Sequence, residues 1–185
     1  MSLNKTNQQR LMDLAKDSIW HGLQTGRPIK VDLDDYPAEL TELRATFTTL
    51  QINQQLRGCI GMLEAVRPLA HDIAENAYSA AFKDPRFLPL ESHEFDDLEI
   101  HLSILMPASP VLFSSEQDLL SQLQPGIDGL ILEEGHRRGT FLPSVWESLP
   151  EPEQFLRELK RKAGLLPDYW SQNIRISRYQ AEIIG

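Results

Sequence analysis

The 185-residue sequence has one cysteine, Cys59. A single cysteine excludes an intrachain disulfide framework and a zinc site built from several cysteines. Long apolar runs are also missing, since none approaches the roughly 18 residues that a membrane-spanning helix needs. The N-terminal segment is polar and amphipathic, unlike a secretory signal peptide. We therefore expect a cytoplasmic protein that does not enter a membrane.

Positive charge is scarce as well. The chain has 18 Lys and Arg against 27 Asp and Glu, which gives a formal net charge of −9 at pH 7. Because general nucleic-acid binding requires a basic surface, this balance disfavours nucleic acid as a partner, although a local basic patch would still be compatible with the composition. Neither common Gly-rich phosphate loop is present, and no two histidines have the i, i+4 spacing of a helical zinc site. We predict no metal and no cofactor.

The apolar periodicity predicts helices and strands that alternate irregularly within one domain, with room for a small second lobe. The predicted helices cover residues 6–23, 37–43, 68–82, 116–123, 143–149 and 153–163. The predicted strands cover residues 29–33, 45–50, 56–63, 98–104, 130–132, 140–142 and 174–179. Short turns between successive strands favour an α+β fold with a largely antiparallel sheet flanked by helices over a doubly wound parallel sheet.

The most unusual stretch is Leu56-Arg57-Gly58-Cys59-Ile60-Gly61, on the returning arm of the predicted hairpin. Glycines allow another group to approach the main chain closely, so Gly58 and Gly61 suggest a tight bend or a strand over which something passes. Cys59 is a candidate nucleophile if nearby positive charge stabilises its thiolate. On a regular strand Arg57 would share its face. The alternative is that Cys59 is a small buried core residue.

A second unusual stretch, Phe82-Lys83-Asp84-Pro85-Arg86-Phe87, ends the helix before it, because a proline disfavours helical geometry in the preceding residue. The two phenylalanines bracket a charged turn, which indicates either a binding role or a loop anchored by its aromatics. Asp84 and Arg86 form either a local ion pair or a pair that orients a substrate. His71 or His101 could activate Cys59 across the fold, and the spacing does not decide between them.

In their order along the chain, these motifs resemble the AMMECR family, whose bacterial and archaeal branch is called AmmeMemoRadiSam system protein A. The resemblance covers residues 45–179 and rests on residues 56–61, 76–77, 80–87, 99–105, 126–129, 140–143, 145–146 and 162–165. One departure is Ala45-Thr46-Phe47-Thr48-Thr49-Leu50, where the family usually reads Gly-Ala-Phe-Val-Thr-Leu.

The resemblance implies one AMMECR-type domain over residues 1–185, with a two-lobed α+β fold and the Leu56–Gly61 signature near the cleft between the lobes. It also implies association with a Memo-like protein and a radical S-adenosylmethionine protein, and it supplies no activity. The matched segments contain the candidate binding residues Gly58, Gly61, Asn76, Phe82 and Phe87.

Three functional hypotheses follow. In the first, the chain is an enzyme or enzyme subunit in which Cys59 is a nucleophile or substrate contact. Arg57 then binds an anion or stabilises the thiolate, while Asp84 and Arg86 orient the substrate. In the second, the chain is a non-catalytic adaptor that docks a partner protein, for which we expect an exposed apolar patch near the hexapeptide. The third is an RNA-associated module.

Overall fold

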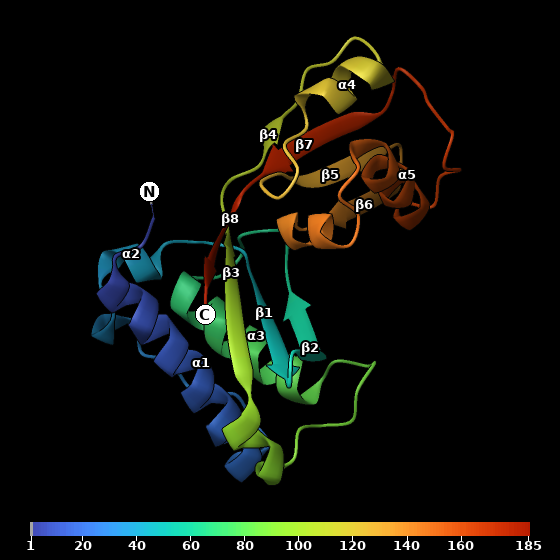
Figure 1. Cartoon of the computed structure of the whole chain (residues 1–185). Helices are drawn as coiled ribbons and strands as arrows, with labels where there is room; N and C mark the ends of the chain where they lie inside the picture. Colours follow the sequence, from blue (N-terminus) through green and yellow to red (C-terminus); the bar gives the residue numbers. More distant parts are fainter. Residues whose placement is uncertain (1) are drawn as a thin grey trace. The chain divides into compact units, whose positions relative to one another are not determined.

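The computed structural model describes residues 2–185, which divide into two compact units (Figure 1). Unit 1 comprises the chain up to Leu105 together with Glu182–Gly185, and unit 2 comprises Met106–Ala181. Each unit has a four-stranded antiparallel sheet flanked by helices, in the orders β2-β1-β3-β8 and β4-β7-β5-β6. The predicted α+β class is confirmed, with two sheets in place of the single sheet expected.

The elements of unit 1 are α1 (Lys5–Thr25), α2 (Ala38–Thr41), β1 (Thr46–Ile52), β2 (Gln55–Gly61), α3 (Leu69–Phe82), β3 (Glu99–Leu105) and β8 (Ala181–Ile184). Those of unit 2 are β4 (Ser109–Pro110), α4 (Glu116–Gln122), β5 (Gly129–Glu134), β6 (Arg137–Phe141), α5 (Pro152–Lys162) and β7 (Arg175–Tyr179). Short 3-10 helices cover Leu33–Asp35, Ser92–Asp97 and Pro143–Glu147. Within residues 2–185, none of the helices is long and apolar enough to cross a membrane.

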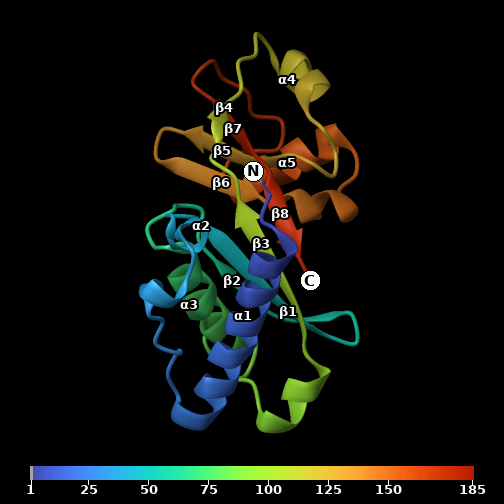
Figure 2. The same ribbon diagram turned by 90° about the vertical axis from the view of Figure 1, so that its left-hand side faces the viewer.

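The helices α1 and α3 pack against each other and against one face of the first sheet (Figure 2). Helix α1 is capped by Asn4, whose side chain accepts a hydrogen bond from the Asn7 amide. It ends at Gly26, whose left-handed φ of 71° suits glycine. The strand predicted over residues 29–33 is absent, because this segment runs without strand partners into the 3-10 turn at Leu33–Asp35.

Strands β1 and β2 form the predicted antiparallel hairpin. Its tip is Asn53-Gln54, both with positive φ, the backbone twist that two-residue hairpin turns require. The register shifts between Leu50 and Gln51, which pair with Gly58 and Leu56, so Arg57 lies opposite no residue of β1. This bulge bends the strand locally, so the Arg57 side chain does not follow the regular alternation between the two faces of the sheet.

The core of unit 2 lies between its sheet and the helices α4 and α5. Its centre is a stacked aromatic pair, Trp146 and Phe155, with ring centroids 3.7 Å apart. Lys160 of α5 is fully buried and pairs with Glu116 of α4. The helix predicted over residues 143–149 is a shorter 3-10 helix, and β6 begins earlier than predicted, at Arg137.

Candidate functional site

Cys59 lies on β2, an edge strand of the unit 1 sheet, and its side chain is half-buried. It is opposite Thr49 of β1, which in turn is opposite His101 of β3. We call the sheet face that carries these three residues the outer face. Cys59 Sγ and Thr49 Oγ1 are 3.3 Å apart, within hydrogen-bonding distance.

The strand register shows which of the two candidate histidines, His71 or His101, lies on the same face of the sheet as the Cys59 thiol. His101 shares the outer face with Cys59 but is two strands away, about 10 Å at the usual strand spacing, with Thr49 between them. His71 is on α3, where its Nε2 lies 3.2 Å from the Val31 carbonyl oxygen. The structure therefore aligns Cys59 with His101 without bringing them into contact.

Asp84 and Arg86 hold the main chain of Cys59 from outside the sheet, and we call this pair the edge clamp. Asp84 Oδ2 accepts a hydrogen bond from the Cys59 amide at 2.9 Å, and Arg86 Nη2 donates one to the Cys59 carbonyl oxygen at 3.3 Å. Because these groups point outward, Cys59 and Thr49 form a non-hydrogen-bonded pair, the kind with the closer side chains. The clamp also occupies backbone groups that an edge strand would otherwise present to another chain.

The two clamp side chains form a short bidentate ion pair. Arg86 Nε and Nη2 donate to Asp84 Oδ1 and Oδ2 at 2.9 and 2.6 Å, and the Arg86 amide also donates to Oδ1. Asp84 is buried, at 4% exposure, while the Arg86 side chain is 54% exposed. The Arg86 hydrogen bonds, aided by those from the Cys59 and Arg86 amides, hold the pKa of Asp84 well below its usual range.

Arg57 pairs with Glu94 rather than with the sulfur of Cys59. Its Nε and Nη2 donate to the Glu94 carboxylate at 2.7 and 2.9 Å, and these hydrogen bonds lower the pKa of Glu94 to about 2. The ring of Phe87 lies near both arginines, with its centroid 6.0 Å from the Arg57 guanidinium carbon and 5.4 Å from that of Arg86. The result is a compact cluster of two ion pairs around one aromatic ring.

The two glycines of the hexapeptide are required by close packing, and neither has a positive φ. A Cβ built on Gly58 would lie 2.1 Å from the carbonyl oxygen of Ala80 in α3. A Cβ on Gly61 would lie 2.3 Å from the ring of Phe47. The expectation that another group passes close to this strand is confirmed on both faces.

Asn76 and Phe82 lie apart from this cluster. Asn76 is buried on α3, where its amide donates to Thr46 and to the Asp72 carboxylate. Phe82 packs against the ring of Tyr78, with centroids 5.0 Å apart, next to Gly22 of α1. The structure thus gathers Arg57, Gly58, Cys59, Asp84, Arg86 and Phe87 at one edge of the sheet.

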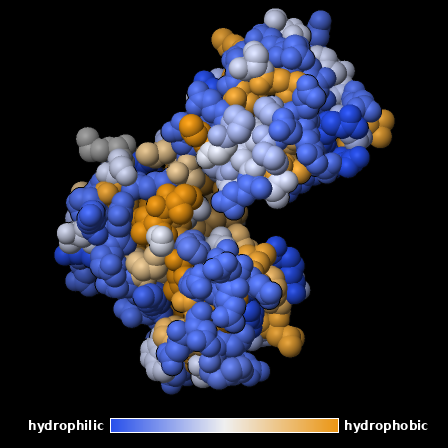
Figure 3. Space-filling model, in the orientation of Figure 1, coloured by the Kyte–Doolittle hydropathy of each residue, from blue (hydrophilic) through white to orange (hydrophobic). Residues whose placement is uncertain are grey.

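Two exposed leucines are adjacent in sequence to residues of the cluster. Leu56 precedes Arg57 and is 42% exposed, and Leu88 is 83% exposed. Leu88 lies between Phe87 and Pro89, which both contact the Arg57 guanidinium. On the face drawn in Figure 3, apolar patches interrupt a mostly hydrophilic surface.

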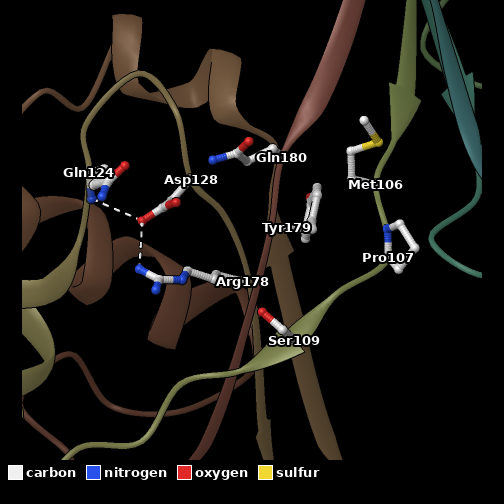
Figure 4. A pocket seen from close by; sticks show the side chains of 8 residues that line it. All are labelled: Met106, Pro107, Ser109, Gln124, Asp128, Arg178, Tyr179 and Gln180. Carbon is white, nitrogen blue, oxygen red and sulfur yellow. Dashed lines mark hydrogen bonds and ion pairs between the residues drawn. The ribbon is translucent and has the colours of Figure 1, made fainter. Parts of the chain in front are cut away.

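Unit 2 contains a pocket of about 280 Å³ that the sequence did not indicate (Figure 4). It is lined by Met106, Pro107, Ser109, Gln124, Asp128, Arg178, Tyr179 and Gln180. Pro125-Gly126 is typical of a turn, and the chain turns at residues 125–127, with Gly126 at a φ of 80°. What the turn pattern could not show is that β4 and β7 lie beside it, since β4 is only two residues long. Within residues 2–185, no group of three or more His, Cys, Asp or Glu side chains could hold a metal ion.

Comparison with known proteins places this geometry in a family. The AMMECR1 family profile matches residues 12–184. A protein of Methanothermobacter thermautotrophicus is 37% identical over 98% of this chain and 95% of its own length. A protein of Methanocaldococcus jannaschii is 38% identical over 83% of this chain and 79% of its own length.

A solved structure agrees with the fold. The crystal structure of an uncharacterized protein from Pyrococcus horikoshii superimposes with a TM-score of 0.85 at 35% sequence identity, and the match covers 94% of this chain and 88% of that one. Both the sequence profile and the structure extend over nearly all of the described chain. The chain belongs to the AMMECR1 family.

Proposed function

We propose that this chain is an enzyme subunit whose site around Cys59 binds a substrate, in a system with a Memo-like protein and a radical S-adenosylmethionine protein. The observation that carries the proposal is the set of ion pairs and hydrogen bonds formed by the side chains around the Cys59 thiol. Arg57 and Arg86, the two cations of the site, are paired with Glu94 and Asp84. The hydrogen-bonding partner of the Cys59 sulfur is Thr49.

These contacts favour Cys59 as a substrate contact over Cys59 as a nucleophile. A catalytic thiol is activated by an adjacent base or cation. Here β1 separates Cys59 from His101, and the clamp residues bind the main chain of Cys59 rather than its sulfur. The fixed main chain instead supports a stable surface on which the half-buried sulfur is presented to a ligand. The activity would then reside in the assembled system.

Because the chain has one cysteine, alkylation by iodoacetamide tests the proposal directly. We expect Cys59 in the native protein to react, and to be protected when the two partner proteins and their substrate are added. We also expect Cys59→Ser to retain most of the turnover of the complete system. Loss of turnover in Cys59→Ser with unchanged partner binding would identify a nucleophile, and alkylation that is unaffected by the partners and substrate would contradict the proposed site.

A second candidate, the non-catalytic adaptor, is favoured by the exposed leucines beside Arg57. In this version Leu88 contributes to the docking surface, so Leu88→Asp should abolish co-purification with a partner while Cys59→Ala leaves it intact. Leu166→Asp is the matched control, because Leu166 is also exposed, at 75%, and lies in unit 2. Equal loss of binding in Leu88→Asp and Leu166→Asp would exclude a specific surface at Leu88.

A further inference from the structure

The unit 2 pocket is independent of the site around Cys59, because all of its lining residues lie within Met106–Ala181. It is bounded by β4, the end of β7 and the turn before β5, and Figure 4 shows polar side chains from these elements directed toward one space. Its volume of about 280 Å³ is near the lower end of small-molecule pockets. Any ligand must therefore be small.

Asp128 supplies a buried negative charge at this pocket. It is 2% exposed, and its Oδ2 accepts a hydrogen bond from the backbone N–H of Gln124 at 2.9 Å. The other oxygen, Oδ1, has no hydrogen bond from residues 2–185. A buried carboxylate is stable when several donors surround it, so this group has capacity for a further donor.

Arg178 supplies the opposite charge without closing the ion pair. Its Nη1 lies 3.8 Å from Asp128 Oδ2, longer than the 2.7–2.9 Å or so of a charge-assisted hydrogen bond. The same nitrogen donates to the Gln122 carbonyl oxygen at 3.4 Å, and the side chain is 39% exposed. A guanidinium has five N–H donors, so most of those of Arg178 are available for an acceptor.

The rest of the lining is neutral. The side chains of Gln124, Gln180 and Ser109 provide donors and acceptors, and none is hydrogen-bonded to another group within the described residues 2–185. The Tyr179 hydroxyl is engaged away from the pocket, 3.2 Å from Thr140 Oγ1 and 3.0 Å from the Phe141 carbonyl oxygen, so only its ring contributes. The charges in this pocket are thus one carboxylate and one guanidinium.

We infer that this pocket binds a small zwitterion of the free amino acid class. The ammonium group donates to Asp128, and the carboxylate accepts from Arg178. The two protein groups are close enough that a ligand must carry both charges on neighbouring atoms, as an α-amino acid does on one carbon. The glutamine amides and Ser109 complete the hydrogen bonds of the ligand at the rim.

The test is a titration of the full-length, ¹⁵N-labelled protein followed through the side-chain amide signals of Gln124 and Gln180. The probes are L-alanine, L-serine, L-leucine, L-glutamate and L-lysine, each up to about 10 mM, a range that detects millimolar dissociation constants. We expect at least one to shift these signals in a saturable way. Its N-acetyl derivative, without the ammonium, and its carboxamide, without the carboxylate, should each bind at least about tenfold more weakly.

Variants assign the two charges. In Asp128→Asn, the free amino acid and its N-acetyl derivative should bind with the same affinity. In Arg178→Gln, the free amino acid and its carboxamide should bind with the same affinity. Asp168→Asn, which alters a carboxylate of unit 2 that is 81% exposed, should change neither. The inference is overturned if no probe shifts the glutamine signals, or if the N-acetyl compound binds as well as the free one. Should Asp128→Asn not fold, the derivative series on the unmodified protein still decides.

Discussion

Each unit contains a buried aspartate that faces an arginine, and the two pairs differ in how they are closed. Asp84 and Arg86 in unit 1 form hydrogen bonds of 2.6 and 2.9 Å, and both residues also bind the main chain of Cys59. Asp128 and Arg178 in unit 2 are 3.8 Å apart. The two carboxylates are buried almost equally, at 4% and 2% exposure.

The difference separates a structural pair from a pair that has capacity for a ligand. A bidentate carboxylate–guanidinium pair satisfies most of the hydrogen-bonding capacity of the acid, so Asp84 gains little from an added molecule. A loose pair leaves the buried carboxylate of Asp128 under-satisfied, while Arg178, at 39% exposure, keeps donors available for a ligand. The predictions below test this contrast between the edge clamp and the pocket.

The largest effect should come from disturbing the packing behind the edge clamp. Gly58→Val would place side-chain atoms against the Ala80 carbonyl of α3, 2.1 Å from the new Cβ, and this backbone atom cannot move without shifting the helix. We expect a loss of about 3 kcal/mol in the free energy of unfolding, the upper end of typical overpacking costs. Urea denaturation, with hydrogen exchange in α3 and β2 to locate the effect in unit 1, measures it. Gln55→Val, at an exposed position of the same strand, is the control.

The next effect compares the two aspartates directly. Asp84→Asn removes the charge from a closed, buried pair, and we expect a loss of about 2 kcal/mol, less than the full cost of breaking a buried pair because Arg86 remains in contact with water. Asp128→Asn should cost less than about 1 kcal/mol, since its Arg178 contact is long. The measurement is urea denaturation of both variants at pH 7. Equal losses would show that the two ion pairs contribute equally to the free energy of unfolding, which would contradict the contrast between them.

The sequence alone does not predict the difference between the two aspartate–arginine pairs, although it does predict the fold class. Alternation along Leu98–Ile104 and the flanks of Asn53-Gln54 were sufficient to predict β3 and the β1–β2 hairpin, because these signals are local. The short strands β4 and β8 carry too few residues for any periodicity, and only the chain contacts of the folded protein create them.

The site shows the same limit. The hexapeptide and the Phe82–Phe87 turn could be singled out from residue types, and five of the candidate residues in them do lie together with Arg57. Regular alternation placed Arg57 beside Cys59, but the bulge opposite Leu50 and Gln51 and the carboxylate of Glu94 decide where its guanidinium goes. Glu94 is 37 residues away in sequence, so no local pattern could reveal it.

A smaller effect should appear as a pH dependence confined to the unit 1 cluster. The pKa of Glu94 is about 2 in the folded protein, against an ordinary value of about 4.3 for the unfolded chain. A folded-state pKa below the unfolded-state value means that the carboxylate stabilises the fold above about pH 5, and that this contribution is lost as the pH falls to about 2. Asp84, whose pKa is lowered in the same direction, adds to this loss.

We therefore expect the free energy of unfolding to fall between pH 5 and pH 2, and the fall to be smaller by about 1 kcal/mol in Glu94→Gln. This is less than the full pKa difference would give, because water reaches both side chains of the Arg57–Glu94 pair, which are 15% and 21% exposed. The measurement is the urea midpoint as a function of pH. Asp168→Asn serves as the control, since that carboxylate is exposed. An unchanged pH profile in Glu94→Gln would show that the Arg57 pair does not persist in solution.

The smallest effect concerns two neighbouring threonines of β1 that differ in their partners. Thr49 Oγ1 is the hydrogen-bonding partner of the Cys59 sulfur on the outer face, whereas Thr48 Oγ1 is buried and has no partner within residues 2–185. Removing an unsatisfied buried hydroxyl can stabilise a protein, so Thr48→Val should raise the free energy of unfolding by up to about 1 kcal/mol and leave the alkylation of Cys59 unchanged. Thr49→Val should change stability by less than about 0.5 kcal/mol but slow alkylation by iodoacetamide about threefold, because the hydroxyl no longer stabilises the reacting thiolate. An equal alkylation rate in both variants would mean that the Thr49 contact does not influence the thiol, and the role of Cys59 as a ligand contact would then depend on its exposure alone.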